Sequence, residues 1–118
     1  MKAIENIRAH FTAIGRRHID VPEWGEKGAD GEVIVPLRIY FTPLTLTEQQ
    51  KLSNVGENTG WHIRFADAII LKAQDEQGKP MFTLDDKHTL CHQTEAHVLN
   101  RVAAQLLSAP TTEEAAKN

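Results

Sequence analysis

Apolar residues recur over the first fourteen positions of the chain with the period of one helix face. They are spaced three, four and three residues apart, at Ile4, Ile7, Phe11 and Ile14. This spacing is typical of an amphipathic α-helix. Gly15, followed by the basic pair Arg16 and Arg17, indicates where the helix ends. The pattern therefore predicts a short amphipathic helix at the start of the chain.

Two β-strands joined by a loop are predicted next. Residues 18–24 (HIDVPEW) alternate Ile19 and Val21 with polar neighbours, and residues 32–41 (EVIVPLRIYF) are rich in β-branched and aromatic side chains. The segment between them carries three glycines, which predicts a long hairpin loop. Pro36 indicates an edge position or a bulge. The face expected to pack is formed by Val33, Val35, Leu37, Ile39 and Phe41.

The stretch FTPLTLTEQQKL, residues 41–52, predicts a strand that ends and a helix that begins at once. Pro43 stops strand pairing, and Thr45 followed by Glu48 matches a capping box, in which each side chain bonds the backbone N–H of the other. We expect a helix from about residue 46 that GENTG, residues 56–60, ends. Its inward residues are expected to be Leu46, Leu52 and Val55, and its outward residues Gln49, Gln50 and Lys51.

The second half of the chain predicts further helices. An apolar face formed by Ile63, Ala66, Ile70 and Ala73 favours a helix over a competing strand in residues 68–74. Asp75 and Gly78 supply turn chemistry in DEQGKP, residues 75–80, and Thr83 or Asp85 can cap a short helix through Leu90. Thr94 is expected to cap the last helix. The broad stripe of that helix is formed by Val98, Leu99, Val102, Ala103, Leu106 and Leu107.

These elements predict a small α+β protein, with a β-hairpin or short antiparallel sheet packed with about four to five α-helices. A chain of 118 residues fits one domain, which we place at residues 1–108. Residues 109–118 lose apolar periodicity and gain polarity, so they are expected to form a flexible C-terminal tail.

Composition narrows the classes of function. The formal charge is −3 and no basic run exceeds Arg16-Arg17, which disfavours a nucleic-acid partner. The longest apolar run, residues 68–71, is far below the roughly 20 residues that cross a bilayer. The polar N-terminus does not match a secretion signal, and the single Cys91 cannot form an internal disulfide. We therefore expect a cytoplasmic protein that does not bind membranes.

A cluster of metal-binding residue types lies in HTLCHQTEAH, residues 88–97. On a helix, His88 and His92 would share a face at the i, i+4 spacing that can hold zinc, with Cys91 close by. A structural zinc site usually needs four ligands, so surface histidines beside a half-buried cysteine are the favoured interpretation. His92 cannot easily take the Cys91 proton, because neighbouring helical side chains point about 100° apart. No catalytic, metal or cofactor site is predicted, and the protein is not expected to be an enzyme.

Three segments occur in an order that resembles a known family. They are VPEWG at 21–25, FTPLTLTEQQKL at 41–52 and FADAIILKAQDEQGKPMFTLDD at 65–86, followed by the helix around VLNRVAAQLLS. The arrangement is similar to the tail assembly chaperones of long-tailed phages and prophages, over roughly residues 18–108. Thr42 stands where that family often has arginine. The residues that carry the resemblance as a fold signature are Pro22, Trp24, Pro43, Thr45, Glu48, Asp75, Gly78 and Phe82.

The resemblance implies a function in virus assembly. Such chaperones bind the tape measure protein, assist polymerisation of the major tail protein around it and leave before the virion matures. Candidate partner-binding residues are Ile63, Ala66 and Ile70 in one helix and Leu99, Val102 and Leu106 in another, although each could instead be core. Two alternatives stay open: a small tail or neck protein retained in the virion, and a His/Cys metal-binding regulatory module. Self-association into a homo-oligomer also stays open.

Overall fold

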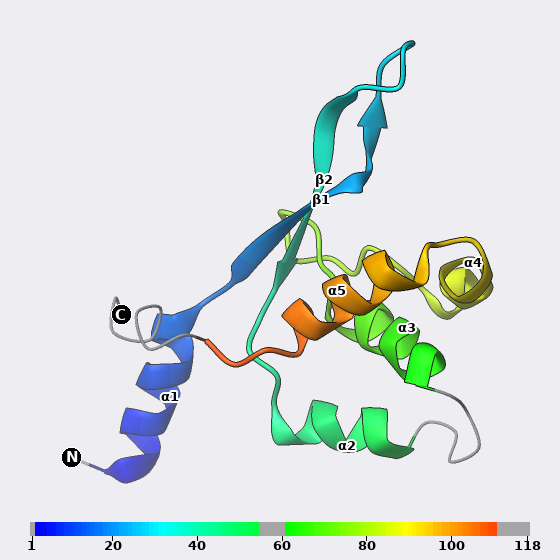
Figure 1. Ribbon diagram of the computed structural model, residues 1–118. Helices are drawn as coiled ribbons and strands as arrows, with labels where there is room; N and C mark the ends of the chain where they lie inside the picture. The colour runs from blue at the N-terminus through cyan, green and yellow to red at the C-terminus, as the bar shows by residue number, and fades with distance from the viewer. Residues whose placement is uncertain (1, 55–60, 111–118) are drawn as a thin grey trace.

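The computed structural model describes residues 2–54 and 61–110, and within them a small α+β fold, as predicted. Its elements, in chain order, are α1 (Ala3–Ile14), β1 (Arg17–Lys27), β2 (Val33–Phe41), α2 (Leu46–Asn54), α3 (Trp61–Lys72), the 3₁₀ turn η1 (Leu84–Asp86), α4 (Lys87–His92) and α5 (Ala96–Leu106). Figure 1 shows the hairpin and α1 extending from a cluster formed by the other helices. None of the helices in these ranges is long and apolar enough to cross a bilayer.

The two strands form one antiparallel hairpin with a large bulge. Val21 pairs with Leu37, and the next pair joins Glu26 to Val35. Four residues of β1, 22–25, therefore lie opposite the single residue Pro36. Proline has no N–H to donate to the ladder, so interrupting the strand pairing at Pro36 sacrifices fewer hydrogen bonds than at another residue. The predicted bulge at Pro36 is confirmed.

Only the base of the hairpin packs against the helices. Ile39 and Phe41 are buried, whereas Val33 and Val35 are 43% and 51% exposed. The prediction that the whole odd-numbered face packs is therefore wrong for its distal half. The reason is visible in Figure 1, where the hairpin extends beyond the helices that cover its base.

The core lies between the hairpin base, α3 and α5, the two central helices of Figure 1. The prediction of a helix rather than a strand at α3 is confirmed. Trp24, Phe82 and Cys91 pack against this core and are partly buried. Its buried apolar residues are Val21, Ile39, Phe41, Ala66, Ile69, Ala73, Leu90, Val98, Leu99, Val102, Ala103 and Leu106.

Several helix ends follow the predicted chemistry. Gly15 ends α1 with a φ of +64°, a left-handed conformation that favours glycine. Thr83 forms a capping box with Asp86 before η1 and α4. Thr94, however, does not cap α5: its hydroxyl donates to the Leu90 carbonyl oxygen at 2.7 Å and so closes α4 instead.

The interior face predicted for α2 is partly wrong. Leu46 is 70% exposed, because it is the first residue of the helix and lies beyond the edge of the core. Leu52 is half-buried, and residues 49–51 are exposed as predicted. Val55 and the glycine-rich break at 56–60 lie outside the described residues, as do residues 111–118 of the predicted C-terminal tail.

Candidate functional site

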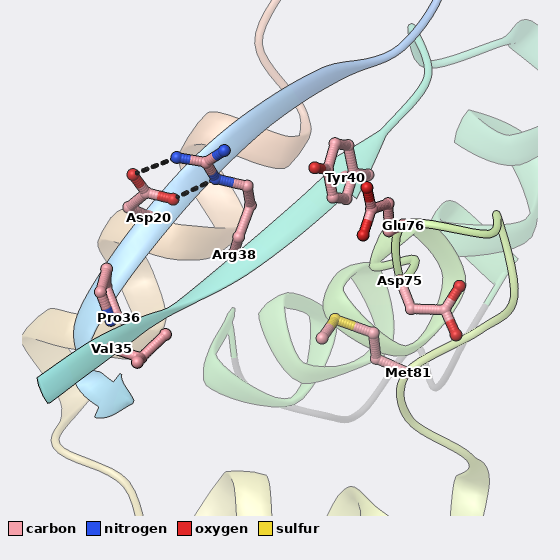
Figure 2. A pocket seen from close by; sticks show the side chains of 8 residues that line it. All are labelled: Asp20, Val35, Pro36, Arg38, Tyr40, Asp75, Glu76 and Met81. Atoms are coloured by element: carbon pink, nitrogen blue, oxygen red, sulfur yellow. Dashed lines mark hydrogen bonds and ion pairs between the residues drawn. The ribbon is translucent and has the colours of Figure 1, made fainter. Parts of the chain in front are cut away.

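An open groove of about 420 Å³ runs between β2 and the turn that follows α3 (Figure 2). Asp20 and Arg38 pair across the hairpin on one side of it, with Arg38 Nε donating to Asp20 Oδ1 at 2.8 Å. This hydrogen bond and the charge of Arg38 lower the pKa of the Asp20 carboxyl below its ordinary value. The groove is lined by Asp20, Val35, Pro36, Arg38, Tyr40, Asp75, Glu76 and Met81.

Three charged side chains of this groove make contacts within the protein: Asp20 pairs with Arg38, and Asp75 bonds the backbone of its own turn. The Asp75 carboxylate accepts the backbone N–H groups of Gln77 and Lys79, both at 2.9 Å, which fixes the turn. Gly78 in the same turn has a φ of +84°. Among the described residues that line the groove, no nucleophile lies beside a base that could activate it.

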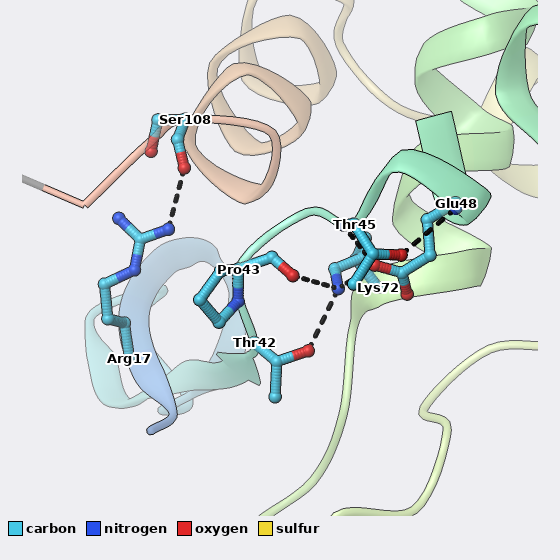
Figure 3. Close-up of polar contacts among 7 residues, drawn as sticks. All are labelled: Arg17, Thr42, Pro43, Thr45, Glu48, Lys72 and Ser108. Carbon is cyan, nitrogen blue, oxygen red and sulfur yellow. Dashed lines mark hydrogen bonds and ion pairs between the residues drawn. The ribbon is translucent and has the colours of Figure 1, made fainter. Parts of the chain in front are cut away.

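The strand-to-helix junction is a structural site (Figure 3). The Thr45 backbone N–H donates to Glu48 Oε1 at 3.0 Å, and the Glu48 N–H donates to Thr45 Oγ1 at 3.2 Å. Both halves of the predicted capping box are therefore present. Pro43, just before it, is buried. The junction fixes the angle at which the chain leaves β2 and enters α2.

Sequence reasoning missed the residue on which this junction is built. Lys72, at the end of α3, is only 1% exposed. Its ammonium donates to Thr42 Oγ1 at 3.0 Å, to the Pro43 carbonyl oxygen at 3.3 Å and to Glu48 Oε1 at 2.8 Å. The sequence analysis does not single out Lys72, because nothing in the local pattern shows which acceptors the fold brings around it.

The Glu48 carboxyl responds to two opposing influences. Partial burial raises its pKa, because water no longer solvates the charge. The bonds and charge of Lys72, with the bonds from Thr45, outweigh burial and leave the pKa below its ordinary value. The Glu48 carboxyl is therefore ionised at neutral pH, and its contact with Lys72 ties α2 to α3.

The VPEWG segment is also structural. Glu23, inside the bulge, accepts two bonds from Arg101 of α5, at 2.9 and 2.6 Å. The bonds from Arg101 lower the pKa of Glu23 to about 2. Pro22 is exposed, but its carbonyl oxygen accepts a hydrogen bond from the Lys27 ammonium at 2.9 Å. The fold-signature residues thus lie in three separate places, the bulge of β1, the strand-to-helix junction and the segment after α3, rather than in one site.

Most residues predicted to contact a partner are core residues in this structure. Ala66, Leu99, Val102 and Leu106 are at most 3% exposed, so they are not available on the surface. Ile70 is half-buried and packs against the core. Ile63 belongs to α3, but its side chain is not among those that the structure describes. The two stripes are apolar because they face each other across the core.

The histidine cluster comes together only in part. The His88 and His92 rings lie 4.4 Å apart, as the i, i+4 spacing predicts. Within the part of the chain that the structure describes, no group of three or more His, Cys, Asp or Glu side chains is placed to hold a metal ion. A pair of histidines with no third ligand beside it is a poor structural zinc site.

Three of the exposed large apolar side chains lie together on α1. Ile4, Ile7 and Phe11 are 52%, 61% and 43% exposed, and no residue of this helix is buried. Figure 1 shows α1 beyond the base of β1, apart from α3 and α5. The sequence predicted the stripe correctly but gave no sign that the fold would leave it uncovered.

No family model matches the sequence, and comparison with curated proteins and with solved structures finds no significant match. The family resemblance therefore depends on the order and spacing of the three motifs.

Proposed function

We propose that this protein binds an amphipathic helical segment of another protein. More specifically, we propose that it is a tail assembly chaperone of a long-tailed phage or prophage. In this role it would bind the tape measure protein in the bacterial cytoplasm and assist the major tail protein to polymerise around it. It would then leave before the virion matures.

The observation that carries the proposal is the uncovered stripe of α1. Burying apolar side chains contributes roughly 25 cal/mol per Å² removed from water, and α1 leaves three large ones exposed. Neighbouring apolar side chains left exposed on one helix face support an interaction site there. The order of VPEWG, PLTLTE and DEQGKPMF supplies the reason for choosing this family of helix-binding proteins.

Co-expression tests the proposal. The tape measure protein encoded in the same genome would be expressed alone, with this protein, and with an unrelated small soluble protein as control. We expect it to stay soluble and to co-purify only with this protein. Aggregation to the same extent in all three samples would contradict the proposal.

Purified particles separate a chaperone from a retained tail or neck component. Mass spectrometry of mature virions should detect the major tail protein and the tape measure protein but not this chain. Its presence at a fixed ratio to the other tail proteins would favour the retained component.

A further inference from the structure

Within the part of the chain that the structure describes, no element packs against α1 closely enough to bury any of its residues. It has 12 residues, none of them buried. Isolated helices of fewer than about 12–15 residues are marginal in water, because nucleation is costly and most helix stability comes from packing an apolar face. This helix would therefore gain stability from a further surface that covers its exposed residues Ile4, Ile7 and Phe11, which we call the α1 stripe.

The residues beside the α1 stripe define the charge of that surface. At 100° per residue, Arg8 and His10 lie roughly 80° to either side of the stripe's centre. Ala9 lies on the opposite face. Among the described residues, no carboxylate forms an ion pair with Arg8. The stripe is thus bordered by a guanidinium with no ion-pair partner there and by an imidazole that can donate a hydrogen bond.

This border disfavours a second copy of α1 as the occupant. Arg8 lies near the middle of Ala3–Ile14. Two copies packed antiparallel along the stripe would bring their Arg8 side chains together. Two parallel copies would place Arg8 of one beside His10 of the other, so neither arrangement supplies Arg8 with a carboxylate. Like charges at the edge of a helix pair are destabilising, whereas a partner helix with acidic flanks would form an ion pair with Arg8 and offer His10 a hydrogen-bond acceptor.

We infer that the α1 stripe docks an amphipathic helix of a partner protein whose apolar face is flanked by acidic residues. This inference rests on the proposed function, in which that helix belongs to the tape measure protein. Docking would follow the helix-against-helix mode, with apolar side chains supplying affinity and the flanking charges selecting the partner.

A matched pair of peptides tests the inference on the full chain. One designed, fluorescein-labelled amphipathic helix carries Leu at the a and d heptad positions and Glu at e and g. Its twin carries Lys at e and g. By fluorescence anisotropy at low peptide concentration, the Glu peptide should bind about tenfold more tightly than the Lys twin. Arg8→Glu should reduce or reverse this preference.

Substitutions at two exposed residues distinguish the contribution of the stripe to peptide binding from that of the opposite face of the helix. Ile7→Asp should weaken binding of the Glu peptide by about tenfold or more, because it places a charge at the centre of the stripe. Ala9→Asp, on the opposite face, should leave binding within about twofold. Circular dichroism melting curves check that both variants fold. Equal binding of the twin peptides, or equal losses in the two variants, would overturn the inference.

Other outcomes distinguish this inference from the proposed function. A dimer in sedimentation velocity that Ile7→Asp dissociates would assign the stripe to a second copy and overturn the inference. If Ile7→Asp keeps the tape measure protein soluble as well as wild type does, the inference fails and the chaperone function stands. If the peptides discriminate as expected while wild type does not keep that protein soluble, the docking surface is supported and the chaperone function fails.

Discussion

The ammonium of Lys72 and the carboxylate of Glu48 lie 2.8 Å apart although the residues are 24 positions apart in the chain. The same Glu48 oxygen accepts the Thr45 backbone N–H. One carboxylate therefore both caps α2 and neutralises a buried cation at the end of α3. The junction that the sequence presents as a local cap is also a tertiary contact.

Removing the charge of Glu48 and removing the charge of Lys72 should lower the free energy of unfolding by different amounts. Glu48→Gln leaves the buried Lys72 ammonium with only neutral acceptors, and we expect it to lower the free energy of unfolding by about 1–3 kcal/mol. Lys72→Met removes the buried charge itself and leaves a carboxylate that water still reaches, so we expect a smaller loss, about 1 kcal/mol. Urea denaturation of both variants measures the difference. A larger loss in Lys72→Met would show that its bonds to Thr42 and Pro43 matter more than charge balance.

The cap itself can be tested separately. Thr45→Ala removes the hydroxyl that accepts the Glu48 N–H, and should lower the free energy of unfolding by about 0.5–2 kcal/mol. Thr47→Ala is the matched control, because Thr47 is exposed in the first turn of the same helix. Partner binding by folded Thr45→Ala should be unchanged. A large loss of binding at an unchanged melting temperature would place Thr45 in the binding surface.

Acid should weaken the contact between the bulge and α5. The pKa of Glu23 is about 2 in the folded protein, against 4.5 ordinarily. A carboxyl with a depressed folded-state pKa stabilises the fold above its unfolded pKa, and this contribution is lost as pH falls from about 4.5 towards 2. Arg101→Gln should therefore be less stable than wild type at pH 7, with a gap that narrows over this interval.

Urea midpoints measured from neutral pH downward provide the comparison. Lys27→Gln is the control, since its ammonium bonds a backbone carbonyl oxygen rather than a carboxylate. A gap between Arg101→Gln and wild type that stays constant with pH would mean that Glu23 does not titrate through this contact.

Gly25 in the bulge does not have a positive φ, so its backbone conformation alone does not require glycine. A Cβ on Gly25 would lie 2.1 Å from the Val35 carbonyl oxygen, so the strands would have to separate. We expect Gly25→Ala to cost about 2–3 kcal/mol of unfolding free energy. Gly31→Ala meets no neighbouring atom but has a φ of +85°, and should cost about 1–2 kcal/mol. Thermal melts compare them, and an equal or larger loss in Gly31→Ala would contradict the close approach.

Local chemistry was predictable where the signal and its cause lie within a few residues. The stop at Gly15, the bulge at Pro36 and the cap at Thr45 each depend on neighbours in sequence. The apolar period of α3 also sufficed to exclude a strand. In these places the sequence pattern and the structure agree because the same short-range sterics and hydrogen bonds determine both.

Burial was harder to predict, because it depends on which faces meet. The stripes of α1 and α5 look alike as patterns, yet that of α5 is core and that of α1 is exposed. Lys72 shows the converse, a charged residue that is buried because acceptors from the junction converge on it. Neither outcome can be read from periodicity, which reports that a face is apolar and not what covers it.

The contact between Arg17 and the end of α5 has a consequence for how the chain is made. The Arg17 guanidinium donates to the Ser108 carbonyl oxygen at 2.7 Å, across 91 residues of sequence. The hairpin emerges from the ribosome first, and α5, which contributes to the core around Val21 and Ile39, is synthesised later. Cooperative folding must therefore wait until α5 has been synthesised. A nascent chain stalled before residue 96 would expose the apolar base of the hairpin to cellular quality control.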